Sequence, residues 1–261
     1  MPRPLLRQRA LVVRTYDFGE ADRVVVLLTR ERGLVRAVAK GVRRAKSRFG
    51  SRLQLFVELD VALYVSSAGT APGGLNQRLS TITEADTRQF LGSGIIEDYE
   101  RYTAASAVLE AATRLAADDG DPFLFDAALG ALQDIRTADE PTLPLDAFFL
   151  RAMSHLGWQP SLFDCAACGA PGPHRAFHPG AGGAVCERCR PPDAPTPPPA
   201  TMQLMWRLLH GYDTTDLEQR LGKRNFAEAV LHAHRMTKGY LQWHMERRFT
   251  SLNVSEGDLA R

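Results

Sequence analysis

The cysteines are the feature that most constrains this 261-residue chain, because all four fall into two Cys-x2-Cys pairs. One pair is Cys165 and Cys168, the other is Cys186 and Cys189, and 17 residues separate them. Each pair can present two thiolates to a common point, and two such pairs complete a tetrahedron of sulfur around Zn2+. We therefore predict a four-cysteine zinc module.

Other roles for these cysteines need a context that the sequence does not supply. Disulfides are typical of secreted proteins, and no secretory signal pattern is recognisable. A redox Cys-x2-Cys pair belongs to a thioredoxin-like βαβ unit, which is not indicated here. His174 and His178 lie between the pairs and could replace a cysteine, although we expect both at the surface of a Pro- and Gly-rich loop. Since four thiolates leave no coordination position for water, we predict a structural zinc ion.

Patterns typical of catalytic sites are absent or have a simpler interpretation. The sequence contains no GxxxxGK[ST], GxGxxG or GxSxG motif. His244-x-Glu246 matches half of a nucleobase-deaminase signature, but both cysteine pairs precede it and neither follows a proline. Glu20 and Asp22 could form a carboxylate pair, but we interpret them as capping a turn and a strand. We therefore expect neither catalysis nor a small-molecule substrate.

The net charge of +2 conceals an uneven distribution along the chain. Residues 1–52 carry 14 basic and 4 acidic side chains, a net of +10, whereas the remaining 209 carry 18 basic and 26 acidic, a net of −8. This split predicts a polyanionic partner for the N-terminal part. An uninterrupted basic segment contains the candidate nucleic-acid-binding residues Arg36, Lys40, Arg43, Arg44, Lys46, Arg48 and Arg52.

We predict that this basic segment is a mobile loop between two strands, able to follow a phosphate backbone. Aromatic side chains that could stack on bases are sparse, and several of them are candidates for the core. They are Tyr16, Phe18, Phe49, Phe56 and Tyr64. Because no base-reading element is evident, we expect binding that is independent of nucleotide sequence. A protein-interaction scaffold whose basic segment binds an acidic protein is the alternative.

Residue patterns divide the chain into a β part and a helical part. Strand-like runs occupy residues 11–15, 24–29, 34–39 and 53–65, with a further candidate at 75–83, and they predict a small barrel or sandwich. After Glu84 we expect helices at residues 97–117, 123–135, 144–156, 201–210, 216–221 and 225–249, with Arg247 and Arg248 in the final turn. The longest aliphatic run, 24–28, is far too short to cross a membrane.

Four segments carry a resemblance to a known family. They are 11–23 (LVVRTYDFGEADR), 29–34 (TRERGL), 39–48 (AKGVRRAKSR) and 240–252 (YLQWHMERRFTSL). These segments, and the order of the parts, resemble the bacterial recombination mediator family RecO. The resemblance implies a multidomain α+β protein with an N-terminal OB-fold at 1–83. It also implies a helical domain in two parts, at 84–161 and 193–261, with the zinc module inserted at 162–192.

The resemblance also implies a function in DNA repair and recombination. Members of this family bind single-stranded and double-stranded DNA and anneal complementary strands. They act with RecR and the C-terminal tail of the single-strand binding protein SSB to help load RecA. By this resemblance the DNA-binding role falls on Arg36 through Arg52, and we expect a cytoplasmic protein associated with the nucleoid.

Overall fold

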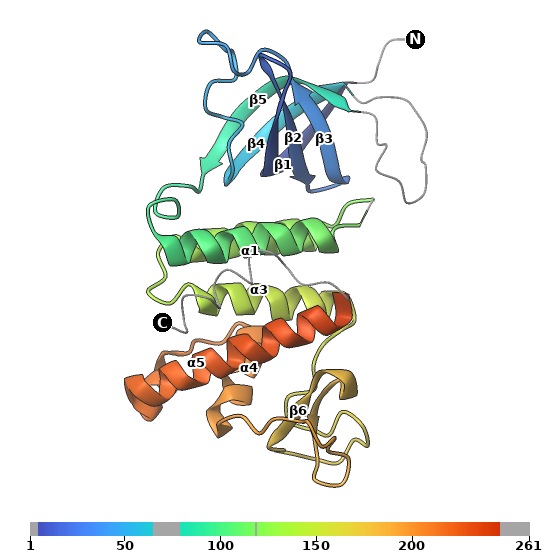
Figure 1. Ribbon diagram of the computed structural model, residues 1–261, viewed down its shortest axis with the longest axis vertical. Helices are drawn as coiled ribbons and strands as arrows, with labels where there is room; N and C mark the ends of the chain where they lie inside the picture. Colours follow the sequence, from blue (N-terminus) through green and yellow to red (C-terminus); the bar gives the residue numbers. More distant parts are fainter. Residues whose placement is uncertain (1–4, 65–78, 118, 246–261) are drawn as a thin grey trace. The chain divides into compact units, whose positions relative to one another are not determined.

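The computed structural model describes residues 5–64, 79–117 and 119–245, in two compact units (Figure 1). One unit consists of Met1–Tyr102 and Leu109–Arg136, and the other of Thr103–Val108 and Thr137–Arg261. The domain bounds expected from the sequence, at 1–83, 84–161, 162–192 and 193–261, divide the chain differently and remain predictions.

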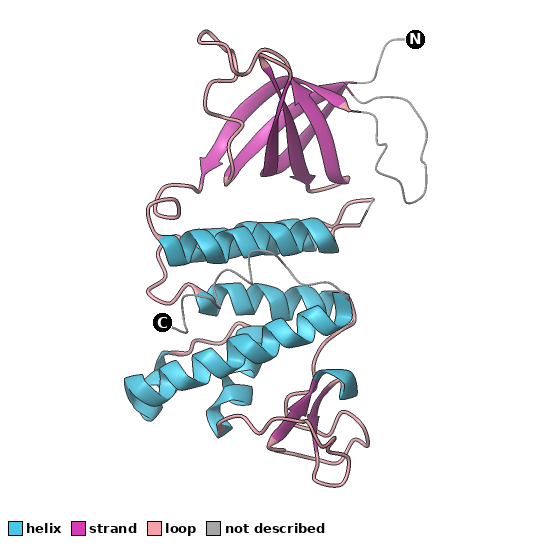
Figure 2. Ribbon diagram, viewed as in Figure 1, coloured by secondary structure: helices cyan, strands magenta, loops and turns pink. Residues whose placement is uncertain are grey.

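The first unit contains a closed five-stranded barrel, drawn in magenta in Figure 2. Its strands are β1 (Leu5–Phe18), β2 (Asp22–Thr29), β3 (Gly33–Ala39), β4 (Val57–Tyr64) and β5 (Ser80–Phe90). The order around the barrel is β1-β2-β3-β5-β4, and every neighbouring pair is antiparallel except β3 with β5. This arrangement confirms the expected OB-fold.

Alternate residues of the strands point into the barrel and form its core, as the period of two in a strand requires. Val12, Val25 and Leu27 are fully buried there. The core also takes Phe49 and Leu53 from the segment between β3 and β4. That segment is longer than the sequence predicted, because β4 begins at Val57 rather than at Leu53.

The expected change from strand to helix after Glu84 is wrong. Residues 84–90 continue β5, and they pair with β4 as far as the partners Val57 and Phe90. Polar, exposed residues such as Arg88 carry little strand propensity, but main-chain pairing with β4 overrides that local preference. The first helix, α1 (Tyr99–Leu115), begins where Asp98 accepts a hydrogen bond from the Arg101 backbone N–H at 2.9 Å.

Helix α2 (Pro122–Ile135) belongs to the barrel's unit and begins one residue before the predicted start at Phe123. Asp121 caps it by accepting the Leu124 N–H at 3.0 Å. Side-chain contacts join α2 to the barrel, among them an ion pair and a cation–ring contact. The Arg30 guanidinium lies 2.8 Å from the Asp126 carboxylate, and the Arg9 guanidinium lies 5.4 Å from the centre of the Phe125 ring.

The second unit packs α3 (Thr142–His155), α4 (Pro199–His210) and α5 (Thr215–Met245) against one another. Helix α5 is interrupted at Gly222, whose φ of 74° and ψ of 158° are not helical, so it corresponds to the two helices expected there. The predicted end of the last helix, with Arg247 and Arg248, lies outside the described residues. Across the described ranges, no helix combines the length and apolar character needed to span a membrane.

Candidate metal centre and nucleic-acid interface

The four cysteines lie on two short turns that flank a small hairpin in the second unit. Cys165 and Cys168 lie in a turn closed by the Gly169 N–H, which donates to the Cys165 carbonyl at 2.8 Å. The hairpin consists of β6 (Ala176–His178), the 3-10 turn η1 (Pro179–Ala181) and β7 (Gly183–Val185). Cys186 follows β7 directly, and the Cys186 carbonyl accepts a hydrogen bond from the Cys189 N–H at 3.1 Å. The hairpin therefore brings the two turns face to face.

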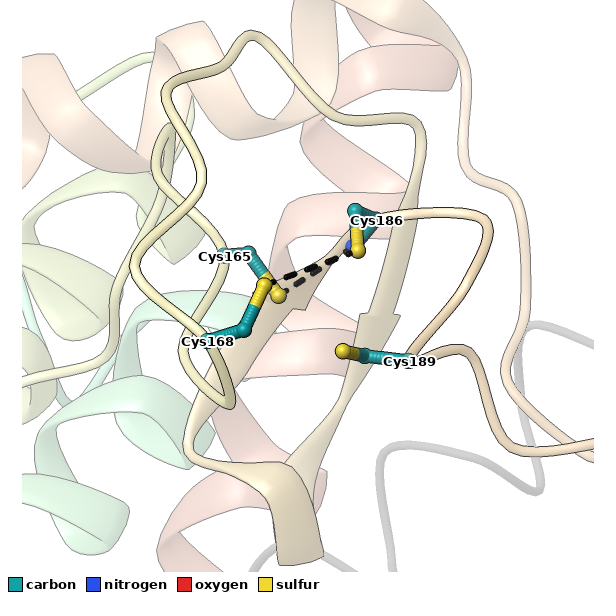
Figure 3. Close-up of side chains that lie close together, drawn as sticks. All are labelled: Cys165, Cys168, Cys186 and Cys189. Carbon is teal, nitrogen blue, oxygen red and sulfur yellow. Dashed lines mark hydrogen bonds between the residues drawn. The ribbon is translucent and has the colours of Figure 1, made fainter.

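The four sulfur atoms all lie within 4.8 Å of one another and point toward a common centre (Figure 3). The Sγ atoms of Cys168 and Cys186 are 3.8 Å apart. Sulfurs at the corners of a tetrahedron with metal–sulfur distances of about 2.3 Å are separated by roughly 3.8 Å. None of the four cysteines is in a disulfide. The predicted ligands are thus brought together with the spacing that a four-thiolate metal site needs.

The polar surroundings of the sulfurs also suit a metal site. The Cys186 backbone N–H donates to the Cys165 sulfur at 3.4 Å, and this bond lowers the pKa of the Cys165 thiol to about 6. Hydrogen bonds that Cys189 shares with the Cys168 and Cys186 sulfurs raise the pKa of Cys189 to about 12. Four thiols this close together share hydrogen bonds, so the pKa of one falls while the pKa of another rises. A metal ion that binds all four would replace their protons.

The segment that carries the cysteines has a very small apolar core of its own. Among the described residues its buried cluster consists of Cys165, Ala176, Val185 and Ala194. A core this small stabilises a loop-rich segment poorly without a metal or a disulfide. The segment also contacts α5, since the Phe177 ring lies 5.8 Å from the Tyr240 ring.

The histidines considered as alternative ligands have other contacts. His174 Nε2 lies 2.9 Å from the Ala170 carbonyl oxygen, and His178 Nε2 lies 3.5 Å from the Asp193 carboxylate. His244 stacks on Trp158 with ring centres 5.2 Å apart, on helix α5 as expected. Glu246 lies outside the described residues. Asp22 acts as the predicted turn cap, because its carboxylate accepts the Gly41 N–H at 2.7 Å.

A second candidate site lies at the rim of the barrel where β1 turns into β2. The segment between β3 and β4, residues 40–56, runs beside this turn, and we call it the basic loop. The Arg43 N–H donates to the Ala21 carbonyl at 3.0 Å, which fastens the loop to the turn. Gly41 has a φ of +69°, a conformation that favours glycine and lets its N–H reach Asp22.

Apolar side chains of the basic loop insert into the barrel core and anchor it, whereas the sequence predicted a mobile loop. Phe49 is 2% exposed and Leu53 is 1% exposed, and both belong to the barrel core. Phe56 is also fully buried, so neither it nor Phe49 can stack on a base. The apolar side chains at these positions were visible in the sequence, but the glycines and charges around them outweighed that signal.

All seven predicted cations of the DNA-binding segment are exposed, and they divide into two groups by their partners. Arg43 lies 3.7 Å from Asp17, and Arg52 lies 3.8 Å from Asp86. The other five have no ion pair with any residue that the structure describes. These five, which we call the unpaired cations, are Arg36, Lys40, Arg44, Lys46 and Arg48.

Other cations of the N-terminal module are mostly paired, so its net charge of +10 overstates the positive surface. Arg7 lies 2.8 Å from Glu84, Arg23 lies 3.1 Å from Asp17, and Arg9 forms an ion pair with Glu58. Several of these carboxylates belong to later strands or to α2, beyond residue 52. The free positive charge is therefore concentrated on the basic loop and the end of β3.

One cation outside the predicted site belongs with this group. Arg14 is exposed on β1, and the strand register places it across Val26 from Arg36. Arg14 lies within the strand run predicted from the sequence, but its place beside Arg36 depends on the pairing of three strands, which the sequence did not give.

Comparison with known families gives two matches. Residues 1–90 match the family described as "Recombination protein O N terminal". Residues 96–253 match the family described as "Recombination protein O C terminal". Together these matches cover nearly the whole chain, including the basic loop and all four cysteines.

Proposed function

The chain belongs to the recombination protein O family, which acts in DNA recombination and repair, and on this premise we propose that it is a recombination mediator. In this proposal it binds single-stranded DNA, anneals complementary strands, and assists RecA loading together with RecR at DNA coated by SSB. The observation that carries the proposal is the group of five unpaired cations, four of them on a loop that the barrel core holds in place and the fifth, Arg36, on β3.

Annealing by such a surface needs no bond-making chemistry. Two DNA strands repel each other through their phosphates, and a cationic surface lowers that repulsion and raises the local concentration of strands. Because Phe49 and Leu53 anchor the basic loop, the backbone that carries its cations is held in place before DNA arrives. Less conformational entropy is then lost on binding than with a free loop. The same phosphate contacts support weaker binding to double-stranded DNA.

The metal centre has a structural role in this proposal. Cys165, Cys168, Cys186 and Cys189 would hold Zn2+, which supplies cross-links between the two turns and no reactive position. The four ligands complete the coordination, so the ion stabilises the hairpin that contacts α5. We propose no catalytic residue.

Protein partners would bind the helical unit rather than the basic loop. The net charge of −8 beyond residue 52 arises from residues 53–136, which carry 5 basic and 13 acidic side chains, whereas residues 137–261 carry 13 of each. The helical unit therefore has no excess positive charge to attract DNA. RecR and the C-terminal tail of SSB are the proposed partners, as the family resemblance implies, and a cytoplasmic location near the nucleoid follows from the same function.

A charge-reversal variant tests the DNA-binding surface. Arg43, Arg44, Lys46 and Arg48 are replaced together by Glu, and binding to a fluorescent single-stranded oligonucleotide is measured with the annealing rate. We expect both to fall by at least about a hundredfold at low salt, because three unpaired cations and the paired Arg43 are lost and four acidic charges are added. A folded variant with unchanged affinity and annealing would refute the proposal.

A matched control separates local contacts from net charge. The same four-residue reversal is made on exposed cations of α5, namely Arg220, Lys223, Arg224 and Arg235. This control changes the total charge equally but leaves the basic loop intact, so we expect it to retain single-strand binding. Equal loss in both variants would mean that overall charge, and not the loop, determines binding.

Titration at several salt concentrations distinguishes the mediator from the scaffold alternative. Five cations that contact phosphates of a single strand predict a slope of about −3.5 for the logarithm of the binding constant against that of salt concentration. If all seven predicted residues take part, the slope approaches roughly −5. Absence of DNA binding, with protein partners still bound, would favour the scaffold.

A further inference from the structure

The last third of β1 exposes two aromatic side chains on one face of the strand. Tyr16 is 47% exposed and Phe18 is 50% exposed. They are two residues apart, so both point to the same side of the strand. The register places Tyr16 beside Val24 of β2, and Val24 beside Val38 of β3. None of these three residues belongs to the barrel core, so the two aromatic rings lie on the outer surface of the barrel.

Positive charge surrounds these rings. The Arg14 guanidinium carbon lies 5.9 Å from the centre of the Tyr16 ring, and Arg14 donates a hydrogen bond to the Tyr16 hydroxyl at 3.0 Å. Arg36, one of the unpaired cations, lies two strands away in the same row as Arg14. The basic loop is fastened to the turn that immediately follows Phe18.

Most acidic side chains near this strip are already engaged. Asp17 forms ion pairs with Arg23 at 3.1 Å and with Arg43 at 3.7 Å. Asp22 accepts the Gly41 N–H, which leaves Glu20 as the exposed carboxylate of the turn. A phosphate backbone that follows the rim therefore meets more free cations than free carboxylates.

One exposed apolar side chain elsewhere in the same unit has the opposite surroundings. Ile96 is 53% exposed, and it directly precedes the exposed acids Glu97 and Asp98. Phosphates would be repelled there. Single exposed aromatics are common on protein surfaces and need no explanation, but a pair beside free cations has the composition of a single-strand binding surface.

We propose that Tyr16 and Phe18 form a base-stacking strip that selects unpaired nucleotides, with Arg14 orienting the Tyr16 ring. The inference rests on the proposed function and deepens it, because the basic loop by itself attracts single and double strands alike. Only unpaired bases can place their faces on these rings. A base held by its face keeps its Watson–Crick edge free, so a stacked strand remains able to pair with a complementary one.

The test compares a Tyr16→Ala/Phe18→Ala variant of the full chain with the wild type on three ligands. These are a single-stranded oligonucleotide, the same strand with abasic sites in place of nucleotides, and the duplex. For the wild type we expect affinity for the abasic strand to be lower by about 25-fold, or about fivefold for each stacked base. The variant should bind the normal strand as weakly as the wild type binds the abasic strand, with duplex affinity unchanged.

Two further variants test whether the preference for single strands depends on the rings of Tyr16 and Phe18 in particular. Tyr64→Ala removes another exposed aromatic, located beside Leu5 at the opposite end of β1, and should keep the wild-type preference for single strands. Tyr16→Phe keeps the ring and should also retain it. Circular dichroism and the melting temperature confirm folding of every variant.

The outcomes separate this inference from the proposed function. If the wild type binds normal and abasic strands equally, or the double variant keeps its preference for single strands, the stacking strip is refuted while DNA binding by the basic loop stands. If the wild type binds no single-stranded DNA, both proposals are refuted. Loss of abasic and normal strand binding together in the variant would also contradict stacking, because it would indicate damage to the phosphate contacts.

Discussion

The basic loop and the cysteine segment solve the same physical problem by different means. Both are long stretches of mostly irregular backbone, residues 40–56 and 161–190, that must be ordered at a cost in conformational entropy. The basic loop inserts Phe49 and Leu53 into a core that the barrel already provides. In the cysteine segment Phe177 is buried, but the cluster around the cysteines contains only small residues, and four thiolates are gathered there instead.

This difference determines which side chains remain free to act on a partner. Apolar anchors lie beneath the basic loop, so its cations are not needed for folding and stay exposed. In the cysteine segment the chemically reactive groups are themselves the anchors, and a four-thiolate site has no open position. We therefore expect loss of an anchor in the loop to weaken DNA binding, and loss of a cysteine to unfold its own segment.

Removal of the metal should have the largest effect. Structural zinc contributes roughly 10 kcal/mol or more of apparent binding free energy to small modules. Chelation, or the substitution Cys165→Ser, should therefore abolish metal binding and unfold residues 161–190. Hydrogen exchange should accelerate throughout that segment, while the barrel strands keep their protection. Unchanged exchange after complete metal removal would show that the segment is held by its contacts with α5 instead.

Loss of the loop's main anchor should come next in magnitude. Phe49→Ala leaves a cavity in the barrel core and should lower the free energy of unfolding by about 3–5 kcal/mol. Phe49→Leu fills much of that space, so it should cost less than about 1.5 kcal/mol. Denaturant unfolding gives both values. In the alanine variant, faster hydrogen exchange at residues 40–56 and weaker single-strand binding should accompany the loss, although no cation has been removed. Wild-type DNA affinity with a loosened loop would contradict the role of preorganisation.

A buried ion pair joins two helices of the helical unit, so its loss should lower the stability of that unit. His234 Nδ1 on α5 donates to the Asp146 carboxylate on α3 at 2.9 Å, and Asp146 is only 1% exposed. His234→Ala leaves this carboxyl without its partner and should cost about 3 kcal/mol. Replacing both residues by Leu should cost much less, because no polar group is then left unpaired. Equal costs in the two variants would show that packing volume, and not the charge, matters.

The same pair predicts a pH dependence. Burial lowers the pKa of His234, but the charge and hydrogen bond of Asp146 outweigh it, so the pKa is raised above 6.5, with Lys238 opposing the rise. Because the pKa of His234 is higher in the folded chain than in the unfolded chain, protonated His234 stabilises the fold. This stabilisation is complete below the unfolded pKa of 6.5, and it is lost as the pH rises through the folded pKa. Unfolding free energy measured from pH 6 to 9 should decline in the wild type and decline less in His234→Ala.

The sequence predicted those features that depend on local patterns. The spacing of the four cysteines, the helix expected at residues 123–135, and the β-branched run of β2 each depend on neighbouring residues. The misassigned segments depend on distant partners. Residues 84–90 form a strand because β4 lies beside them, and Phe49 enters the core because the barrel closes over it. The pairing of Arg30 with Asp126 on α2 likewise joins residues 96 positions apart, so charge counting along the chain overestimated the free cations.

The smallest expected effect separates a paired from an unpaired cation. Arg44 has no ion pair among the described residues, whereas Arg30 lies 2.8 Å from Asp126. Arg44→Gln should reduce the steepness of the salt dependence of single-strand binding by about 0.7, the share of one phosphate contact. Arg30→Gln makes the same change in net charge, but it should leave that slope unchanged and cost less than about 1 kcal/mol of stability. Titrations at four or more salt concentrations resolve this difference. Equal slopes for the two variants would mean that single-strand binding depends only on the total charge of the module. The distinction between the free cations of the loop and the paired cations of the barrel would then have no effect on DNA binding.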